Sequence, residues 1–406
     1  MINNVNHDDK RLITPMIAGL YLMFLLLQVG FFMAIPYASV TRALVFVPIP
    51  SIVITFLLIL ATSSFTTNRG EVQYRFSWIV LTFVLLNIIS LIFIFSRYGS
   101  LDSTAMMAFY YGLGIIIYFP MKKMHSVGLP VLDFTKTIGA IGMLSVLIQT
   151  AFFNLSGHLL VHSINVAKLQ IRSGLRITYY DMFFIFVAAI AVGSILKKSK
   201  RIDWVILLEA VAYFYVVSQT RYLEISLALM IVAIISVNLL SQLKGKYISF
   251  FNLFFSLPVL IVAGIIAMNM AKKLIAPLKD GSYMSDGSYF ARFGELEYYA
   301  QAIQGSPIFG LGNFTASVDS IFWTLLHGPY GFYYTQDMGL FGDVARLGFP
   351  ILVWFVLVVI YVFRKMLHPY TLPLLLLLLM SIGTFSILTN GFIVGMVLAA
   401  LEIFND

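Results

Sequence analysis

The sequence has no cysteine and few charged residues, and both shortages narrow the class of protein. Without cysteine among its 406 residues, disulfides, thiolate metal sites and cysteine nucleophiles are excluded. Charged residues make up 11% of the chain, whereas about 25% is typical of a soluble globular protein. Hydrophobic residues make up 60%. We therefore expect a protein that crosses a membrane many times, without a cleavable signal peptide, because its first apolar run is far longer than a signal sequence.

Long apolar runs recur along the whole chain. They lie at 13–36, 43–62, 77–96, 104–121, 134–153, 181–196, 203–218, 222–242, 248–271, 347–363, 370–388 and 390–403. Since a transmembrane helix needs about 20 apolar residues, we predict an all-α polytopic membrane protein with about twelve transmembrane helices. The N-terminal helices occupy 1–180. The region 181–406 includes a long outer loop, 272–346, between the ninth and tenth spans.

The basic residues predict an orientation. The net charge is +8, from 26 basic and 18 acidic residues. In a polytopic membrane protein, an excess of Lys and Arg usually lies in the cytoplasmic loops. We therefore expect no nucleic-acid partner. With the N-terminus inside, 15 of the 26 basic residues fall in cytoplasmic segments, 10 of them lysine. The Lys197-Lys198-Ser199-Lys200-Arg201 cluster is then cytoplasmic, and both termini lie on the same side.

Arginine, by contrast, predominates on the outer face. The outer arginines are Arg42, Arg97, Arg172, Arg176, Arg221, Arg292 and Arg346. Snorkelling at helix ends is an equally good explanation for Arg42 and Arg97. The other five lie in or beside three outer segments. Because the planar guanidinium binds phosphate or carboxylate in a bidentate manner, these five predict a site for an anionic substrate.

The 272–346 loop carries most candidates for acid–base chemistry. Residues 288–303 have the pattern of an amphipathic helix, and the turn-rich segment Gly305-Ser306-Pro307-Ile308-Phe309-Gly310-Leu311-Gly312 ends it. The candidate general bases are Asp337, which leads by its position, and Glu295, Glu297, Asp343 and His327. Three of them have a structural alternative: Asp337 as a helix cap, Glu295 as the partner of Arg292 one turn away, and His327 as a packed ring among aromatic residues. The loop tyrosines fit either a sugar-stacking wall or an interfacial belt.

Several of these residues form an ordered set. Arg221 ends the segment Ser218-Gln219-Thr220-Arg221 at the outer end of a helix, and Arg292 lies in a predicted helix ahead of Pro307-Ile308-Phe309-Gly310-Leu311-Gly312. Asp337 stands eleven positions before Gly348, which begins a span. Over about 185–365, this set resembles the O-antigen ligase and polymerase superfamily.

The resemblance implies a membrane glycosyltransferase of the GT-C type in the bacterial cytoplasmic membrane, with its active site on the outer face. Ligases of the superfamily move a glycan from undecaprenyl diphosphate to lipid A core, whereas polymerases move the growing chain onto the next lipid-linked repeat unit. Ligases carry a His-Asn pair where this sequence has Asp337-Met338, and an acidic residue there is more usual among polymerases. The expected function is therefore a polysaccharide repeat-unit polymerase.

The residues are consistent with this chemistry. Arg221 and Arg292 match the family positions, Arg176 is the natural third, and Arg172 and Arg346 lie near enough in sequence to contribute. Together they would stabilise the charge that develops on a diphosphate leaving group. No metal site or cofactor is expected.

The expected partners are an undecaprenyl-diphosphate-linked oligosaccharide, membrane lipid, a chain-length regulator and a flippase. A ligase for a lipid or wall acceptor, a flippase for the lipid-linked glycan, and a scaffold of an export complex are the competing interpretations.

Overall fold

The described part of the chain is almost entirely helical. The computed structural model describes residues 7–33, 47–63, 72–99, 101, 103–160, 170–171, 175–178, 180–198, 200–243, 287–314, 322–331, 333–383 and 385–406. The first group of elements is α1 (His7–Gln28), α2 (Gly30–Met33), α4 (Pro48–Ser63), α5 (Ser77–Tyr98), α6 (Ser103–Leu113), η1 (Gly114–Ile117), α7 (Tyr118–Ser126) and α8 (Val131–Ser156). The predicted all-α fold is confirmed for these residues, apart from one pair of two-residue strands, β1 (Gln170–Ile171) and β2 (Leu175–Arg176), which pair antiparallel.

The second group of elements follows the strand pair. It comprises α9 (Asp181–Lys198), α10 (Arg201–Ala212), the π-helix η3 (Tyr213–Ser218), α11 (Arg221–Leu243), α13 (Gly287–Gly305), α14 (Trp323–His327), η5 (Thr335–Met338), α15 (Gly339–Leu347), α16 (Phe349–Lys365), α17 (Leu372–Met380) and α18 (Gly391–Asn405). α9 contacts α8, α10, α11, α17 and α18, and its apolar side chains from Phe184 to Val192 are fully buried. It is the central helix of the fold.

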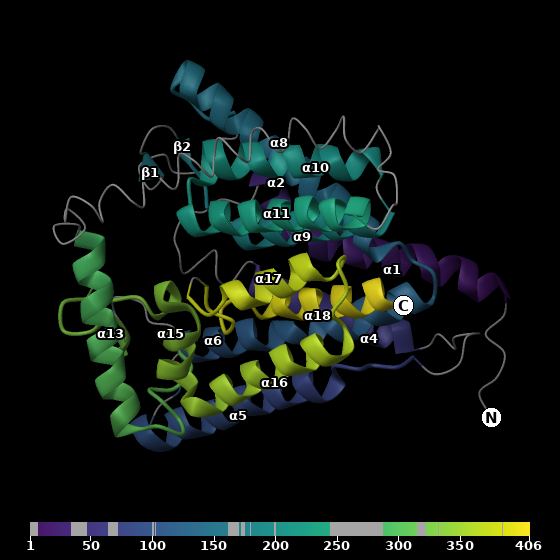
Figure 1. Cartoon of the computed structure of the whole chain (residues 1–406). Helices are drawn as coiled ribbons and strands as arrows, with labels where there is room; N and C mark the ends of the chain where they lie inside the picture. Colours follow the sequence, from purple (N-terminus) through teal and green to yellow (C-terminus); the bar gives the residue numbers. More distant parts are fainter. Residues whose placement is uncertain are drawn as a thin grey trace, which may run out of the picture.

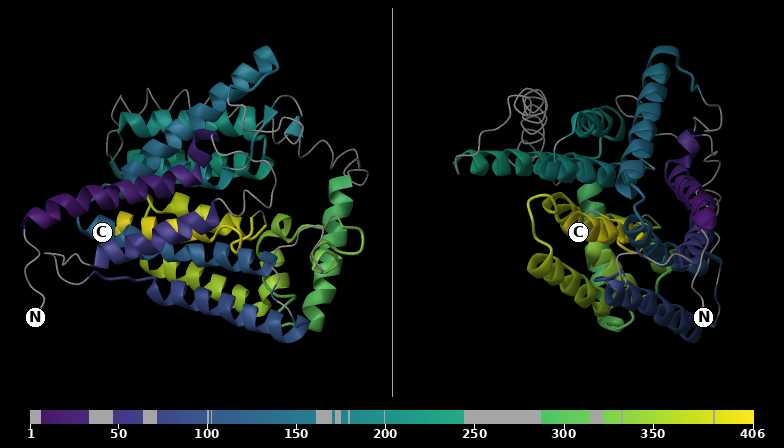
Figure 2. Two further views of the ribbon diagram at one scale, coloured as in Figure 1. Left: turned by 180° about the vertical axis from the view of Figure 1, so that it is seen from behind. Right: turned by 90° about the vertical axis from the view of Figure 1, so that its right-hand side faces the viewer.

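Most helices run lengthwise in the view of Figure 1, and α13, α15 and the β1–β2 pair lie at one end of them. At that end, α13 lies across the helix ends, close to α15, and the β1–β2 pair lies at the same end. The start of α1 and the C-terminus lie at the opposite end, and the reverse view in Figure 2 agrees. The described part of the 272–346 loop and the strand pair that carries Arg176, both predicted on the outer face, therefore share one end of the molecule.

The outer surface of the helices is apolar. α5 and α8 are, among the described helices, long and apolar enough to cross a membrane, and Thr14–Gln28, α4 and α18 are shorter apolar helices. Large apolar side chains are exposed along α4, α5, α8 and α16, including Leu60, Leu81, Leu85, Ile92, Phe95, Leu144, Ile148, Val353 and Ile360. Exposed apolar side chains in this number are typical of a membrane-facing exterior.

Several of the predicted spans are interrupted. The run 13–36 breaks after α1 ends at Gln28, and Phe31 and Phe32 in α2 have left-handed backbone angles. The run 104–121 is divided into α6, η1 and α7, where Gly114 lies so close to α18 that a Cβ on it would be 2.7 Å from the Phe392 ring. The run 370–388 is helical only to Met380, because its later backbone is bound by a buried carboxylate from α15, described below. The predicted span 248–271 lies outside the described residues.

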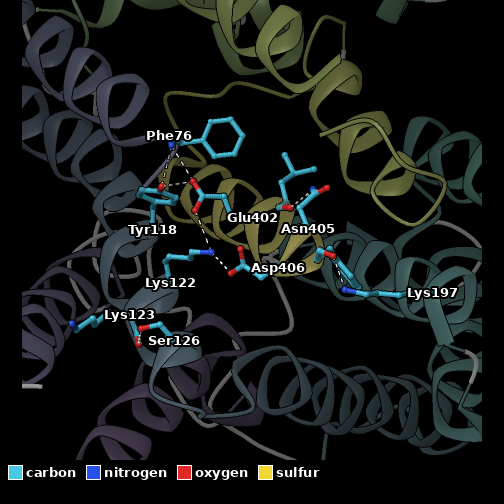
Figure 3. A network of polar contacts seen from close by, with 11 residues as sticks. Phe76, Tyr118, Lys122, Lys123, Ser126, Lys197, Glu402, Asn405 and Asp406 are labelled. Carbon is cyan, nitrogen blue, oxygen red and sulfur yellow. Dashed lines mark hydrogen bonds and ion pairs between the residues drawn. The ribbon is translucent and has the colours of Figure 1, made fainter. Parts of the chain in front are cut away.

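Buried ion pairs join the helices at the end away from α13. Glu402 Oε1 accepts hydrogen bonds from the Tyr118 hydroxyl at 2.5 Å and from the Phe76 backbone nitrogen at 3.0 Å (Figure 3). Lys122 lies 3.4 Å from Glu402 Oε2. In α8, Lys136 donates to Asp203 of α10 at 2.6 Å. Because each charge is paired, these contacts fix neighbouring helices against one another.

Candidate functional site

The predicted amphipathic helix over 288–303 is confirmed as α13, and its buried stripe includes a carboxylate. Glu295, Tyr299 and Ile303 recur every fourth residue and are all buried. Glu295 is only 2% exposed. Its Oε1 atom accepts a hydrogen bond from the Tyr334 backbone nitrogen at 3.0 Å, whereas Oε2 is enclosed and accepts none. A carboxylate in this position is unusual, because burial penalises its charged form.

Arg292, Glu295 and Asp337 lie together, and we name them the Glu295 cluster. Burial raises the pKa of Glu295, with a smaller increase from the charge of Asp337, while the Tyr334 hydrogen bond and Arg292 oppose the rise. Desolvation also raises the pKa of Asp337, against the charge of Arg292. Asp337 is exposed, so solvent screens its charge, whereas Glu295 is enclosed. The described ion pairs do not include one between Arg292 and Glu295.

A tight turn holds Asp337 beside α13. The Asp337 backbone nitrogen donates to the Tyr334 carbonyl at 3.0 Å, so the residue that binds Glu295 also begins the turn that presents Asp337. α15 packs closely under this turn. A Cβ on Gly342 would overlap the carbonyl of Thr335. Glycine at this position therefore permits the approach that places the turn.

His327 is buried next to the cluster, within a group of aromatic rings. Its Nδ1 lies 2.6 Å from the Tyr333 carbonyl, so this nitrogen carries the proton and donates. The ring lies 3.9 Å from the Trp323 ring and 4.8 Å from the Tyr334 ring, measured between centroids. Burial lowers the pKa of His327 and favours the neutral imidazole. These contacts fit the packed-ring alternative, and its role as a base stays a prediction.

Arg346 lies inside the protein. It is 1% exposed, and its Nη2 donates to the Phe314 carbonyl at 3.0 Å. The Gly310–Phe314 segment also binds the end of α15, because Leu311 and Gly312 donate backbone hydrogen bonds to the carbonyls of Ala345 and Arg346. The described contacts of Arg346 thus fix the Gly310–Phe314 segment. A contact between Arg346 and the substrate stays a prediction.

Asp343 of α15 binds the non-helical part of the predicted span 370–388. It is fully buried, with Oδ1 accepting from Ser386 Oγ at 2.5 Å and Oδ2 from the Ile387 backbone nitrogen at 2.7 Å. Burial raises its pKa to about 6, opposed by these hydrogen bonds and by Arg346. This structural role was not predicted for Asp343, a candidate base in the sequence, because its two partners are 43 and 44 residues away.

The remaining arginines lie elsewhere at the same end. Arg221 is exposed and begins α11, directly after the turn that the sequence singled out. Arg176 ends β2 and is described through its backbone alone, and Arg172 lies outside the described residues. No described contact joins Arg221 to the Glu295 cluster. The arginines therefore fall into two groups, one on α13 and one near β2 and α11.

The described residues contain no group of three or more His, Asp or Glu side chains that could hold a metal ion. Comparison with models of protein families and with curated proteins gives no match to this chain.

Proposed function

We propose that this protein is a polysaccharide repeat-unit polymerase of the GT-C type, with about twelve transmembrane helices, in the bacterial cytoplasmic membrane. Its donor is a glycan chain on undecaprenyl diphosphate, and its acceptor is the next lipid-linked repeat unit. The observation that carries the proposal is the Glu295 cluster: two carboxyl groups and an arginine gathered at one end of a helical protein with an apolar exterior. A chain-length regulator and a flippase are the proposed partners.

The two carboxyl groups lie in different environments. Burial and the nearby charge of Asp337 both favour the protonated form of Glu295. Desolvation raises the pKa of Asp337 as well, but this residue is exposed and the positive charge of Arg292 opposes the rise. Paired acids in different environments can divide the roles of a base and a neutral hydrogen-bond donor. We assign the base to Asp337.

In the proposed reaction, the Asp337 carboxylate takes the proton of an acceptor sugar hydroxyl. The hydroxyl oxygen forms a bond to the anomeric carbon of the donor, and the bond from that carbon to the diphosphate oxygen breaks. The diphosphate leaves with the electron pair. Arginines stabilise this departing charge through charge-assisted contacts to the diphosphate oxygens.

The test is a reconstituted reaction with purified protein in lipid nanodiscs and a synthetic lipid-linked repeat unit. A polymerase lengthens the glycan on its lipid carrier, in steps of one repeat unit on a gel. Transfer of the glycan to a different acceptor lipid instead identifies a ligase. If no glycosidic bond forms, but fluorescent lipid-linked glycan crosses the bilayer of proteoliposomes, the protein is a flippase and the proposal is wrong.

A further inference from the structure

A buried carboxylate links the two arginine-bearing segments that lie away from α13. Asp181 begins α9 and is 5% exposed. Its Oδ1 accepts a hydrogen bond from the Tyr213 hydroxyl at 2.7 Å. Its Oδ2 accepts hydrogen bonds from Ser218 Oγ at 2.6 Å and from Thr220 Oγ1 at 3.2 Å. One side chain thus binds three donors from the segment that leads to Arg221.

That segment has an irregular backbone that needs such support. α10 continues into the π-helix η3, a form that is rare and often occurs at functional sites. Gln219 follows with a φ of 49°, in the left-handed region that residues other than glycine seldom adopt. Ser218 and Thr220, on either side of Gln219, donate to the same oxygen of Asp181. This arrangement fixes the turn from which Arg221 begins α11.

Tyr213 extends the connection to the second segment. Its hydroxyl lies 2.8 Å from the carbonyl of Ile177, the residue that follows Arg176 at the end of β2. The single hydroxyl hydrogen can go to Ile177 or to Asp181. The ring packs between Phe184 and Phe214, with centroids 4.8 and 5.1 Å away. β2 and η3 are therefore held together at the backbone beside Arg176.

We propose that Asp181 and Tyr213 are positioning residues for Arg221, which binds the diphosphate of the lipid-linked donor beside β2. The inference rests on the proposed function and adds the two residues that hold this anion site in place. The Glu295 cluster, which lies on separate elements, then takes the proton of the acceptor hydroxyl. This division follows from the separate positions of Arg221 at the start of α11 and Arg292 on α13.

The test measures binding of a fluorescent polyprenyl diphosphate to the purified full chain in nanodiscs. Tyr213→Phe removes the hydroxyl and keeps the ring, so we expect the Kd to rise about tenfold, the size expected for one hydrogen bond to a charged group. Arg221→Ala should raise the Kd at least as much. The double variant Tyr213→Phe/Arg221→Ala should have a Kd less than about twofold above that of Arg221→Ala alone, because the Tyr213 hydroxyl acts through the arginine. Inorganic diphosphate should lose potency as a competitor to the same degree.

Tyr118→Phe is the matched control. It also removes a buried tyrosine hydroxyl bound to a carboxylate, Glu402, which lies near the end of α18. The C-terminus that follows α18 lies at the opposite end of the molecule from β1 and β2 (Figure 1). We expect it to lower thermal stability and leave the Kd unchanged. Should Tyr213→Phe fail to fold, Ser218→Ala removes the neighbouring donor to Asp181 and has the same expected effect.

Two results would overturn the inference while leaving the polymerase in place. One is a Kd for Tyr213→Phe, or for Ser218→Ala, that equals the wild-type value. The other is a Tyr213→Phe effect that is fully additive with Arg221→Ala, which would make the hydroxyl structural only. A wild-type protein that neither binds the probe nor extends glycans would instead refute the proposed function, and the inference with it.

Discussion

The backbone nitrogen of Tyr334 donates to Glu295 Oε1 at 3.0 Å, and the same residue begins the turn that carries Asp337. A buried acid on α13 and an exposed acid in η5, 42 positions apart in the sequence, are thereby kept in a fixed relation. The predictions below start from this relation.

The buried carboxyl group of Glu295 should make stability depend on pH. Because its pKa is raised in the folded protein, the folded state binds more protons than the unfolded state above the ordinary pKa of 4.5. The stability that the protonated Glu295 side chain confers is therefore lost as the pH rises from the ordinary pKa through the raised pKa of the folded protein. Glu295→Gln keeps an acceptor for Tyr334 and removes the titration. We expect its Tm to fall less than the wild-type Tm between about pH 4 and about pH 8. Parallel curves for the two proteins would contradict the assignment.

The approach of α15 to the Asp337 turn should depend on Gly342. An added Cβ would meet the Thr335 carbonyl, so Gly342→Ala should displace the turn and cost about 1–3 kcal/mol of stability. Chain extension should fall more than donor binding does. Gly19→Ala is the matched control, because Gly19 is also helical and a Cβ there meets nothing within 4 Å. Equal thermal stability and activity for both variants would show that the close approach is unimportant.

Asp343 should be among the most sensitive positions for folding. Asp343→Ala removes the acceptor for Ser386 and Ile387 and leaves Arg346 buried beside no carboxylate, at a cost of about 3–5 kcal/mol. Asp343→Asn retains one acceptor oxygen and should cost less. Thermal unfolding in detergent checks both variants, and a wild-type Tm for Asp343→Ala would disprove the role.

The contacts of Asp343 are of a kind that the sequence could not predict, because they join residues far apart in the chain. Apolar periodicity predicted α5, α8 and α13 closely, because each is set by residues within a few turns. It could not predict that the run 370–388 stops being helical at Met380, since the group that binds its backbone is Asp343. Similarly, the sequence singled out the turn before Arg221 but missed Asp181, 37 positions away from Ser218. It also could not give the depth at which Arg346 lies.

The orientation can be tested cleanly because the chain has no cysteine. Gln301 is exposed on α13, and Lys200 is 57% exposed at its side chain between α9 and α10. A cysteine at position 301 should react with a membrane-impermeant maleimide in cells with a permeabilised outer membrane. A cysteine at position 200 should react only after lysis. The reverse pattern would invert the proposed topology and place the Glu295 cluster in the cytoplasm.

The most direct test of the central claim is the rate of chain extension by Asp337→Asn, measured with purified protein, a lipid-linked repeat unit and a metal chelator. Asparagine keeps the shape of the side chain and cannot act as a base of comparable strength. We expect extension to fall by about 10²–10⁴-fold, with donor Kd unchanged and with wild-type activity insensitive to the chelator. The control Glu297→Gln changes an exposed acid on α13 and should retain the wild-type rate. A near wild-type rate for Asp337→Asn would contradict the claim and leave Asp337 as a structural element of the turn.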